Sequence, residues 1–177
     1  MPSIILPRKA VSELRKLLDD FDGEVFVSLS ETRAEFRFAV VRLPSKLIDG
    51  TFPDYTRVIP VGNDRVMQVD VSAFSAAVDR VATIASEKSR SVKMGLKPGL
   101  LTLSASNTDA SSATEELEVH YDGVEMEIGF NARYLLDIAG QVNSEMVEFA
   151  LADQGSPSLV RAPGDESSLF VLMPMRV

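Results

Sequence analysis

Residues 65–105 read RVMQVDVSAFSAAVDRVATIASEKSRSVKMGLKPGLLTLSA and hold one complete folding unit. Alternating apolar residues open the stretch, a helical run rich in Ala and Val follows, and two short apolar runs lie on either side of a Lys-Pro-Gly turn. This order predicts a strand, a helix with Ser72 as its N-cap, and a β-hairpin. The expected elements are a strand at Arg65–Val71, a helix at Ser72–Ala85, hairpin strands at Val92–Leu96 and Leu100–Ala105, and a further strand at Thr114–Tyr121.

The same order of elements recurs before and after this stretch. Near the N-terminus, Pro7 suits a first helical position, and the apolar residues of the next three turns share one helical face. Near the C-terminus, Asn131 is expected to cap a helix that follows a strand. The repetition predicts an α+β fold of repeated β-α-β-β-β units, in which antiparallel sheets carry helices on one face. The further expected elements are a helix at Pro7–Asp19, strands at Glu24–Leu29, Ala34–Val41 and Val124–Phe130, a helix from Asn131, and strands at Val147–Ala152, Ser158–Ala162 and Leu169–Met173.

A stretch rich in Pro, Gly and Asp interrupts the repeats between residues 42 and 60. Such composition is typical of a connection between domains. We therefore expect residues 1–43 to form half of one domain, residues 44–60 to be a linker, and residues 61–177 to form a complete domain of two units.

Composition narrows the class of protein. The chain has 177 residues, 45% of them hydrophobic, which predicts a folded protein with a real core. It contains no Cys, so disulfides and thiolate metal sites are excluded, and a cytoplasmic location is expected. No apolar stretch approaches the length of a membrane span. The net charge of −8 is uneven, because residues 1–108 carry 15 Lys and Arg against 13 Asp and Glu, whereas residues 109–177 carry 3 against 13.

The sequence offers little for catalysis. His120 is the only histidine, and it lies in an expected strand where a surface role is typical. The carboxylate pairs Glu115-Glu116, Asp19-Asp20 and Asp165-Glu166 occur at expected turns and strand edges. Metal-ligand spacing is absent, and we expect neither a cofactor nor a metal. A hydrolase that uses the acidic residues is the alternative from the enzyme class, and it would require two facing carboxylates with shifted pKa values.

Two features could bind partners. Arg8, Lys9, Arg15 and Lys16 share the face of the first helix opposite its apolar stripe, and could contact phosphates or could be an ordinary polar exterior. The ending 169–177, LFVLMPMRV, combines a strand-like run with two Met residues. Met side chains suit adaptable peptide-binding surfaces, although a buried final strand explains the run equally well.

Taken together, the linker and the C-terminus resemble a known family, the bacterial sliding clamp or DNA polymerase III beta subunit. The matching segments follow the order and approximate spacing of that family over the whole chain. They are Ser45–Gly50, Phe52–Tyr55, Arg57–Pro60, Ser86–Lys88, Glu125–Asn131, Tyr134–Asp137 and Met173–Arg176. The resemblance implies that residues 1–43 are the second half of the middle clamp domain and that residues 61–177 are the C-terminal clamp domain.

The family binds short peptides beside the linker and the C-terminus, and the resemblance places that site on aliphatic, Met and polar residues of this chain. The implied peptide-binding residues are Pro53, Arg57, Val58, Asn131, Tyr134, Val171, Leu172, Met173, Pro174, Met175 and Arg176. The sequence departs from the family pattern at Ser89, Gly155 and Pro157, which puts the peptide preference in doubt.

The resemblance also implies partners. Arg8 and Lys9 would contact duplex DNA inside a ring, with Arg15, Lys16 and Arg80 as further contacts. The complete ring in this family is a homodimer that encircles DNA independently of sequence and tethers DNA polymerase III, the clamp loader and repair polymerases through short peptides. A non-enzymatic processivity factor is therefore the expected function. The alternative is a half-length peptide-binding adaptor that does not encircle DNA.

Overall fold

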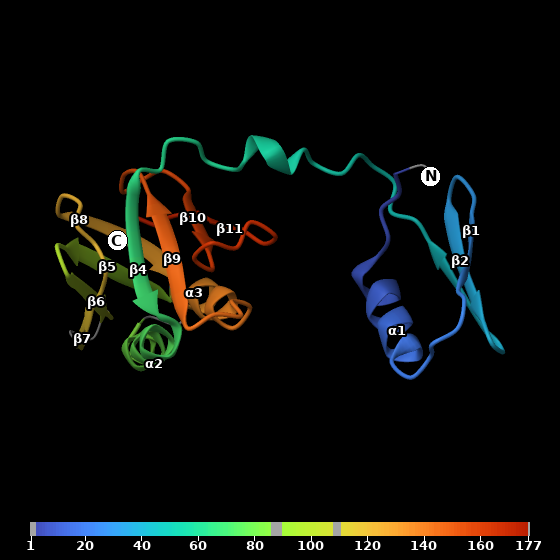
Figure 1. Ribbon diagram of the computed structural model, residues 1–177, viewed down its shortest axis with the longest axis horizontal. Helices are drawn as coiled ribbons and strands as arrows, with labels where there is room; N and C mark the ends of the chain where they lie inside the picture. The colour runs from blue at the N-terminus through green and yellow to red at the C-terminus, as the bar shows by residue number, and fades with distance from the viewer. Residues whose placement is uncertain (1–2, 86–89, 108–110, 177) are drawn as a thin grey trace. The chain divides into compact units, whose positions relative to one another are not determined.

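The computed structural model describes residues 3–85, 90–107 and 111–176, so the segments around Ser86–Ser89 and Asp109, including the expected departure at Ser89, lie outside the described residues. The chain divides into two compact units, residues 1–54 and residues 55–177. Figure 1 shows the elements of both units. They are α1 (Arg8–Leu18), β1 (Phe26–Leu29), β2 (Arg33–Phe38), β3 (Val41–Lys46), the 3₁₀ turn η1 (Tyr55–Arg57), β4 (Arg65–Asp70), α2 (Val71–Ala82), β5 (Ser91–Lys97), β6 (Leu100–Ser106), β7 (Ser112–Glu118), β8 (Met126–Asn131), α3 (Ala132–Ala139), β9 (Met146–Leu151), β10 (Ser158–Arg161) and β11 (Phe170–Leu172).

The first unit is one helix and a three-stranded antiparallel sheet in the order β1-β2-β3. Burial alternates along β2, where Ala34, Phe36 and Phe38 are buried and the residues between them face outward. The ring of Phe38 packs on Phe21, which follows α1, with 5.2 Å between the ring centroids. The sheet therefore has one face inside the unit and one polar face outside it.

The second unit exchanges strands between its two repeats. Sheet order is β11-β10-β9-β4 in one sheet and β7-β6-β5-β8 in the other. β4, which begins the first repeat, thus pairs with β9 of the second, and β8, which begins the second repeat, pairs with β5 of the first. Each repeat gives its first strand to the sheet of the other repeat.

The helices of the second unit lie together. α2 contacts α3 and strands of both sheets, and in Figure 1 the two helices lie beside each other at one end of the sheets. The core includes Phe74 of α2 and Phe149 of β9, both 0–1% exposed, with ring centroids 5.4 Å apart. The expected α+β fold with antiparallel sheets is confirmed. None of the described helices is long and apolar enough to cross a membrane.

Three details differ from the sequence-based expectation. The side chain of Asp70, not Ser72, caps α2, because its Oδ1 accepts a hydrogen bond from the backbone N–H of Ala73 at 2.7 Å. The strand expected at Ala34–Val41 ends at Phe38, because Ala39 adopts φ 45° and turns the chain. The residues that follow form β3. Residues 44–46, which were expected to open the linker, therefore belong to a strand. Pro44 is tolerated there because β3 is an edge strand.

Candidate functional site

The C-terminal segment is anchored against the start of α3. After β11, the backbone N–H of Met175 donates a 2.7 Å hydrogen bond to the carbonyl of Gly129 in β8, in an antiparallel bridge. Asn131, two residues after Gly129, ends β8, and Met173, two residues before Met175, directly follows β11. Asn131 Oδ1 accepts a hydrogen bond from the backbone N–H of Arg133 at 2.9 Å and so caps α3, as the sequence predicted.

β10 brings a second set of residues to the same place. Leu159 pairs with Val171, and both are half-buried on the sheet face opposite the core. The same register, extended by two residues, places Pro157 beside Met173, which is 62% exposed. Tyr134, 56% exposed, lies one helical turn after Asn131. We refer to these six residues, Asn131, Tyr134, Pro157, Leu159, Val171 and Met173, as the C-terminal surface.

The loop between β9 and β10 borders the C-terminal surface and is held by one carboxylate. Asp153 Oδ1 accepts hydrogen bonds from the backbone N–H groups of Gly155 and Ser156 at 2.7 and 2.8 Å, and Asp153 Oδ2 accepts one from Ser156 Oγ at 2.8 Å. These hydrogen bonds, the one from Gly155 first, lower the pKa of Asp153. Asn63 Nδ2 donates to the carbonyl of Pro157 at 2.9 Å, which fixes the end of the loop.

The remaining residues implied by the resemblance have different surroundings. Leu172 is 5% exposed and faces the core, so its side chain supports the surface from below and is not open to a ligand. Pro174 and Met175 are half-buried, and Arg176 is exposed. Arg57 and Val58 are exposed at the end of η1. Pro53 is exposed in the first unit.

Sequence reasoning missed Leu159 as a member of the C-terminal surface. The alternation of β10 does carry the signal, since Ser158 and Val160 are buried and Leu159 is not. The sequence does not show, however, that Leu159 lies next to Val171, and the strand pairing is needed to place it on the C-terminal surface.

Four of the five basic residues expected at DNA lie on α1. Arg8, Lys9, Arg15 and Lys16 are exposed, as is required of phosphate contacts. Lys16 Nζ lies 3.1 Å from Glu13 Oε1, in an exposed pair of little energetic value.

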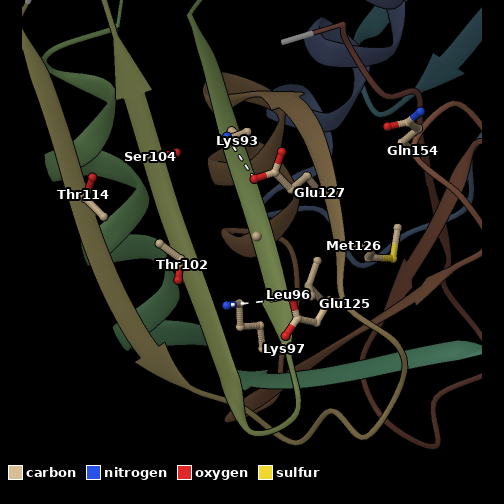
Figure 2. A pocket seen from close by; sticks show the side chains of 11 residues that line it. Lys93, Leu96, Lys97, Thr102, Ser104, Thr114, Glu125, Met126, Glu127 and Gln154 are labelled. Carbon is tan, nitrogen blue, oxygen red and sulfur yellow. Dashed lines mark hydrogen bonds and ion pairs between the residues drawn. The ribbon is translucent and has the colours of Figure 1, made fainter.

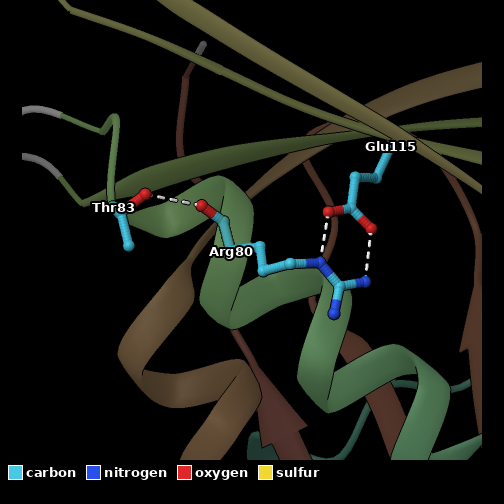
Figure 3. A network of polar contacts seen from close by, with 3 residues as sticks. All are labelled: Arg80, Thr83 and Glu115. Atoms are coloured by element: carbon cyan, nitrogen blue, oxygen red, sulfur yellow. Dashed lines mark hydrogen bonds and ion pairs between the residues drawn. The ribbon is translucent and has the colours of Figure 1, made fainter.

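Arg80, the fifth, has a protein partner. Its guanidinium donates two hydrogen bonds to the Glu115 carboxylate, at 2.5 and 2.6 Å (Figure 3). This bond lowers the pKa of Glu115 and raises that of Arg80. Glu115 would compete with any phosphate for the same fork of donors, so Arg80 is the weakest of the expected DNA contacts.

A hollow of about 660 Å³ in the second unit has a different chemistry (Figure 2). It lies over the outward face of β5, β6 and β8, where Lys93 pairs with Glu127 at 3.0 Å and Lys97 with Glu125 at 3.8 Å. None of the residues implied by the resemblance lines it. Its paired charges make it polar, so it does not offer the apolar walls that would receive Leu or Phe side chains.

The described residues supply no arrangement suited to metal catalysis, since no group of three or more His, Cys, Asp or Glu side chains among them could hold an ion. His120 is exposed. Glu148, 8% exposed, is held by Arg161 Nε at 2.8 Å and Gln68 Nε2 at 2.9 Å, a structural network across three strands. The partners of Glu148, the buried carboxylate among the described residues, are thus a guanidinium and an amide, not a second carboxylate.

Comparison with known proteins gives one consistent result. The family described as DNA polymerase III beta subunit, C-terminal domain, matches residues 56–176, and the central domain of the same subunit matches residues 1–54. A relative in Caulobacter vibrioides, the beta sliding clamp, is 49% identical over all 177 residues, which span 48% of that protein. The chain thus spans about half the length of the curated relatives it matches.

Solved structures agree. A DnaN sliding clamp from Bartonella birtlesii, solved bound to griselimycin, is 50% identical with a TM-score of 0.93, over 100% of this chain and 48% of that one. A Caulobacter crescentus beta sliding clamp with polyethylene glycol bound to its putative beta-motif tethering region is 49% identical with a TM-score of 0.92, over the same shares. With its anchored C-terminal segment and its exchanged repeats, the chain belongs to the DNA polymerase III beta subunit family of bacterial sliding clamps.

Proposed function

We propose that the chain acts as part of a DNA sliding clamp, a processivity factor that catalyses no reaction and tethers enzymes to DNA by binding short peptides. The observation that carries the proposal is the C-terminal surface, which combines exposed Met173 with residues of β8, α3, β10 and β11, in a chain that matches two consecutive clamp domains. A tether raises the effective concentration of an enzyme at its site of action.

Peptide recognition follows from the chemistry of this surface. Leu159, Val171 and Met173 offer aliphatic and thioether walls for Leu or Phe anchors of an extended peptide. The amide of Asn131 and the hydroxyl of Tyr134 lie at the margin, where they would bond peptide backbone or side-chain polar groups. Arg57, Val58, Pro174, Met175 and Arg176 are further candidate contacts in the second unit.

Calorimetry with a Gln-Leu-x-Leu-Phe-like peptide tests the site. We expect binding in the micromolar range or weaker, and loss of at least tenfold in affinity on Met173→Asp, because a carboxylate would enter the apolar contact. Val124→Asp is the matched control, since Val124 is equally exposed at 63% but lies outside the C-terminal surface. Equal affinities of the Met173→Asp variant and the unsubstituted chain would contradict the assignment.

Contact with duplex DNA is proposed for α1. Its four exposed cations can meet phosphates without reading sequence, which supplies nonspecific affinity of roughly 10⁻⁴ to 10⁻⁶ M at physiological salt. A gel shift on linear duplex should be faint, should vanish with added salt, and should weaken on the paired change Arg8→Glu and Lys9→Glu. Nanomolar binding that resists salt would show that the chain holds DNA by tight contacts, contrary to the proposal.

The partners of the tether are proposed on the same basis. Polymerase III, the clamp loader and repair polymerases would present the peptides, and two complete subunits would form a homodimeric ring around DNA in the cytoplasm. Arg80 would take part in DNA contact only by exchanging Glu115 for a phosphate.

A further inference from the structure

The outward face of the first unit's sheet concentrates positive charge. Residues 1–54 contain eight Lys and Arg, four of them on α1 and the other four on this face. Seven of the nine Asp and Glu lie in connections between elements, at residues 19, 20, 22, 24, 31, 49 and 54. We call this face the outer basic face. It comprises Phe26, Arg33, Glu35, Arg37, Arg42 and Lys46.

Strand register shows that these residues share one face. On β2, Arg33, Glu35 and Arg37 alternate with the buried Ala34 and Phe36. Directly across the ladders, Arg33 pairs with Lys46, Arg37 with Arg42, and Phe26 with Arg37. Because Glu35 stands between Arg33 and Arg37, cations recur about 13 Å apart along β2, and each lies about 5 Å from a cation directly across on β3.

One carboxylate holds two of these cations. Glu35, whose side chain is 22% exposed, accepts from Arg42 Nε at 2.8 Å and lies 3.5 Å from Arg37 Nε. Within the described residues, Arg33 and Lys46 have no acidic partner. Glu35 thus keeps Arg37 and Arg42 extended over the sheet, and the face retains a net charge of about +3 from four cations and one carboxylate.

An aromatic side chain completes the face. Phe26 lies opposite Arg37 and is 59% exposed. Exposure of an aromatic ring to water is unfavourable, so the position of this ring calls for a partner. Guanidinium groups bind phosphates, and an exposed ring on a sheet can stack on a base. Bases offer their faces only where they are unpaired, so this combination favours a single strand over a duplex.

We propose that the outer basic face binds single-stranded nucleic acid independently of sequence, with its two pairs of cations on phosphates of the strand and Phe26 stacked on a base. The site lies on the sheet, away from the cations of α1, and goes beyond both the peptide and the duplex contacts proposed above. A clamp with this surface could hold an unpaired strand that runs near the primer end.

The test is fluorescence anisotropy of a fluorescein-labelled oligothymidylate of about twelve nucleotides with the full 177-residue chain. Each phosphate contact to a single strand contributes about 0.7 to the salt exponent, or about fivefold in affinity at 0.1 M salt. The paired change Arg33→Ala and Lys46→Ala should therefore weaken binding about 25-fold. Glu35→Gln should strengthen it about fivefold, because it frees one positive charge. Phe26→Ala should weaken it about 5- to 150-fold.

Controls separate this site from other cations of the chain. The paired change Lys93→Ala and Lys97→Ala in the second unit should leave oligothymidylate binding within twofold. The paired change Arg8→Ala and Lys9→Ala on α1 should weaken it less than the change on the sheet does, and a duplex of the same length should bind more weakly than the single strand. The proposal is overturned if the sheet variants bind as the unsubstituted chain does, if the α1 variant abolishes binding, or if duplex binds as well as single strand. It is also overturned if oligoglutamate competes equally and Phe26→Ala has no effect, since an acidic peptide would then be the partner.

Discussion

The paired rings of Phe74 and Phe149 should couple the two repeats of the second unit energetically. Both side chains are at most 1% exposed, and their centroid separation of 5.4 Å with a 58° tilt falls in the range of favourable aromatic pairs. Replacing Phe by Ala in a core costs about 3–5 kcal/mol, and Leu retains much of the volume, so Phe74→Leu and Phe149→Leu should each cost about 1–2 kcal/mol. Together they should cost about 0.5–1.5 kcal/mol less than the sum, because the ring contact is lost only once.

Urea unfolding followed by tyrosine fluorescence is suited to this measurement. The chain has no Trp, and all three Tyr residues, Tyr55, Tyr121 and Tyr134, lie in the second unit, so the signal reports on that unit alone. Each single substitution should lower the midpoint by about 0.5–1 M. Val124→Ala, at a Val of the second unit that is 63% exposed, is the control and should change stability by less than about 0.5 kcal/mol. Strict additivity of the two Leu substitutions would refute the coupling.

Three further predictions concern polar and backbone features. The pKa of Asp153 is lowered in the folded state, so its ionised carboxylate stabilises the fold above the ordinary Asp pKa. This stabilisation is lost as the pH falls through the lower pKa of the folded state. Below about pH 4, the urea midpoint should therefore fall more steeply for the unsubstituted chain than for the Asp153→Asn variant. Arg80→Ala should leave the urea midpoint almost unchanged, because its side chain is 59% exposed and the ion pair with Glu115 is screened by solvent; a clear fall in the midpoint would mean that the pair is structurally essential. Ala39→Gly should slow hydrogen exchange in β2 and β3 by stabilising the first unit by up to about 1 kcal/mol, since Ala39 has φ 45°, and faster exchange would contradict this.

Local patterns predicted most elements. Asn131 was recognised as the cap of α3 because a polar side chain stands between a strand pattern and a helical one. The cap of α2 was misassigned because Asp70 and Ser72 are both good capping residues only two positions apart, and the sequence does not show which adopts the extended conformation. β3 was hidden by Pro44 and by the apolar continuity across Ala39 and Val40, where the turn depends on a backbone conformation that Ala seldom adopts.

The site could be predicted in part. Family resemblance named the C-terminal residues, but burial divides neighbours that the sequence treats alike, since Leu172 faces the core and Met173 faces solvent. Leu159 and the partner of Arg80 depend on pairings between distant segments, which no local pattern encodes. The outer basic face was missed for the same reason, because its four cations come from two strands of which one was read as linker.

The exchange of first strands between the repeats of the second unit bears on how such a protein could arise. A single repeat on its own would leave its first strand, β4, unpaired, because β4 pairs with β9 of the other repeat. It would also expose the edge of β5 that pairs with β8 in the intact domain. Two separate copies could pair these strand edges only by exchanging their first strands, which is domain swapping between identical chains. When both repeats lie in one chain, the strand exchange is intramolecular and does not depend on protein concentration. Cutting the loop between β7 and β8 should therefore leave two fragments that fold only when they are mixed.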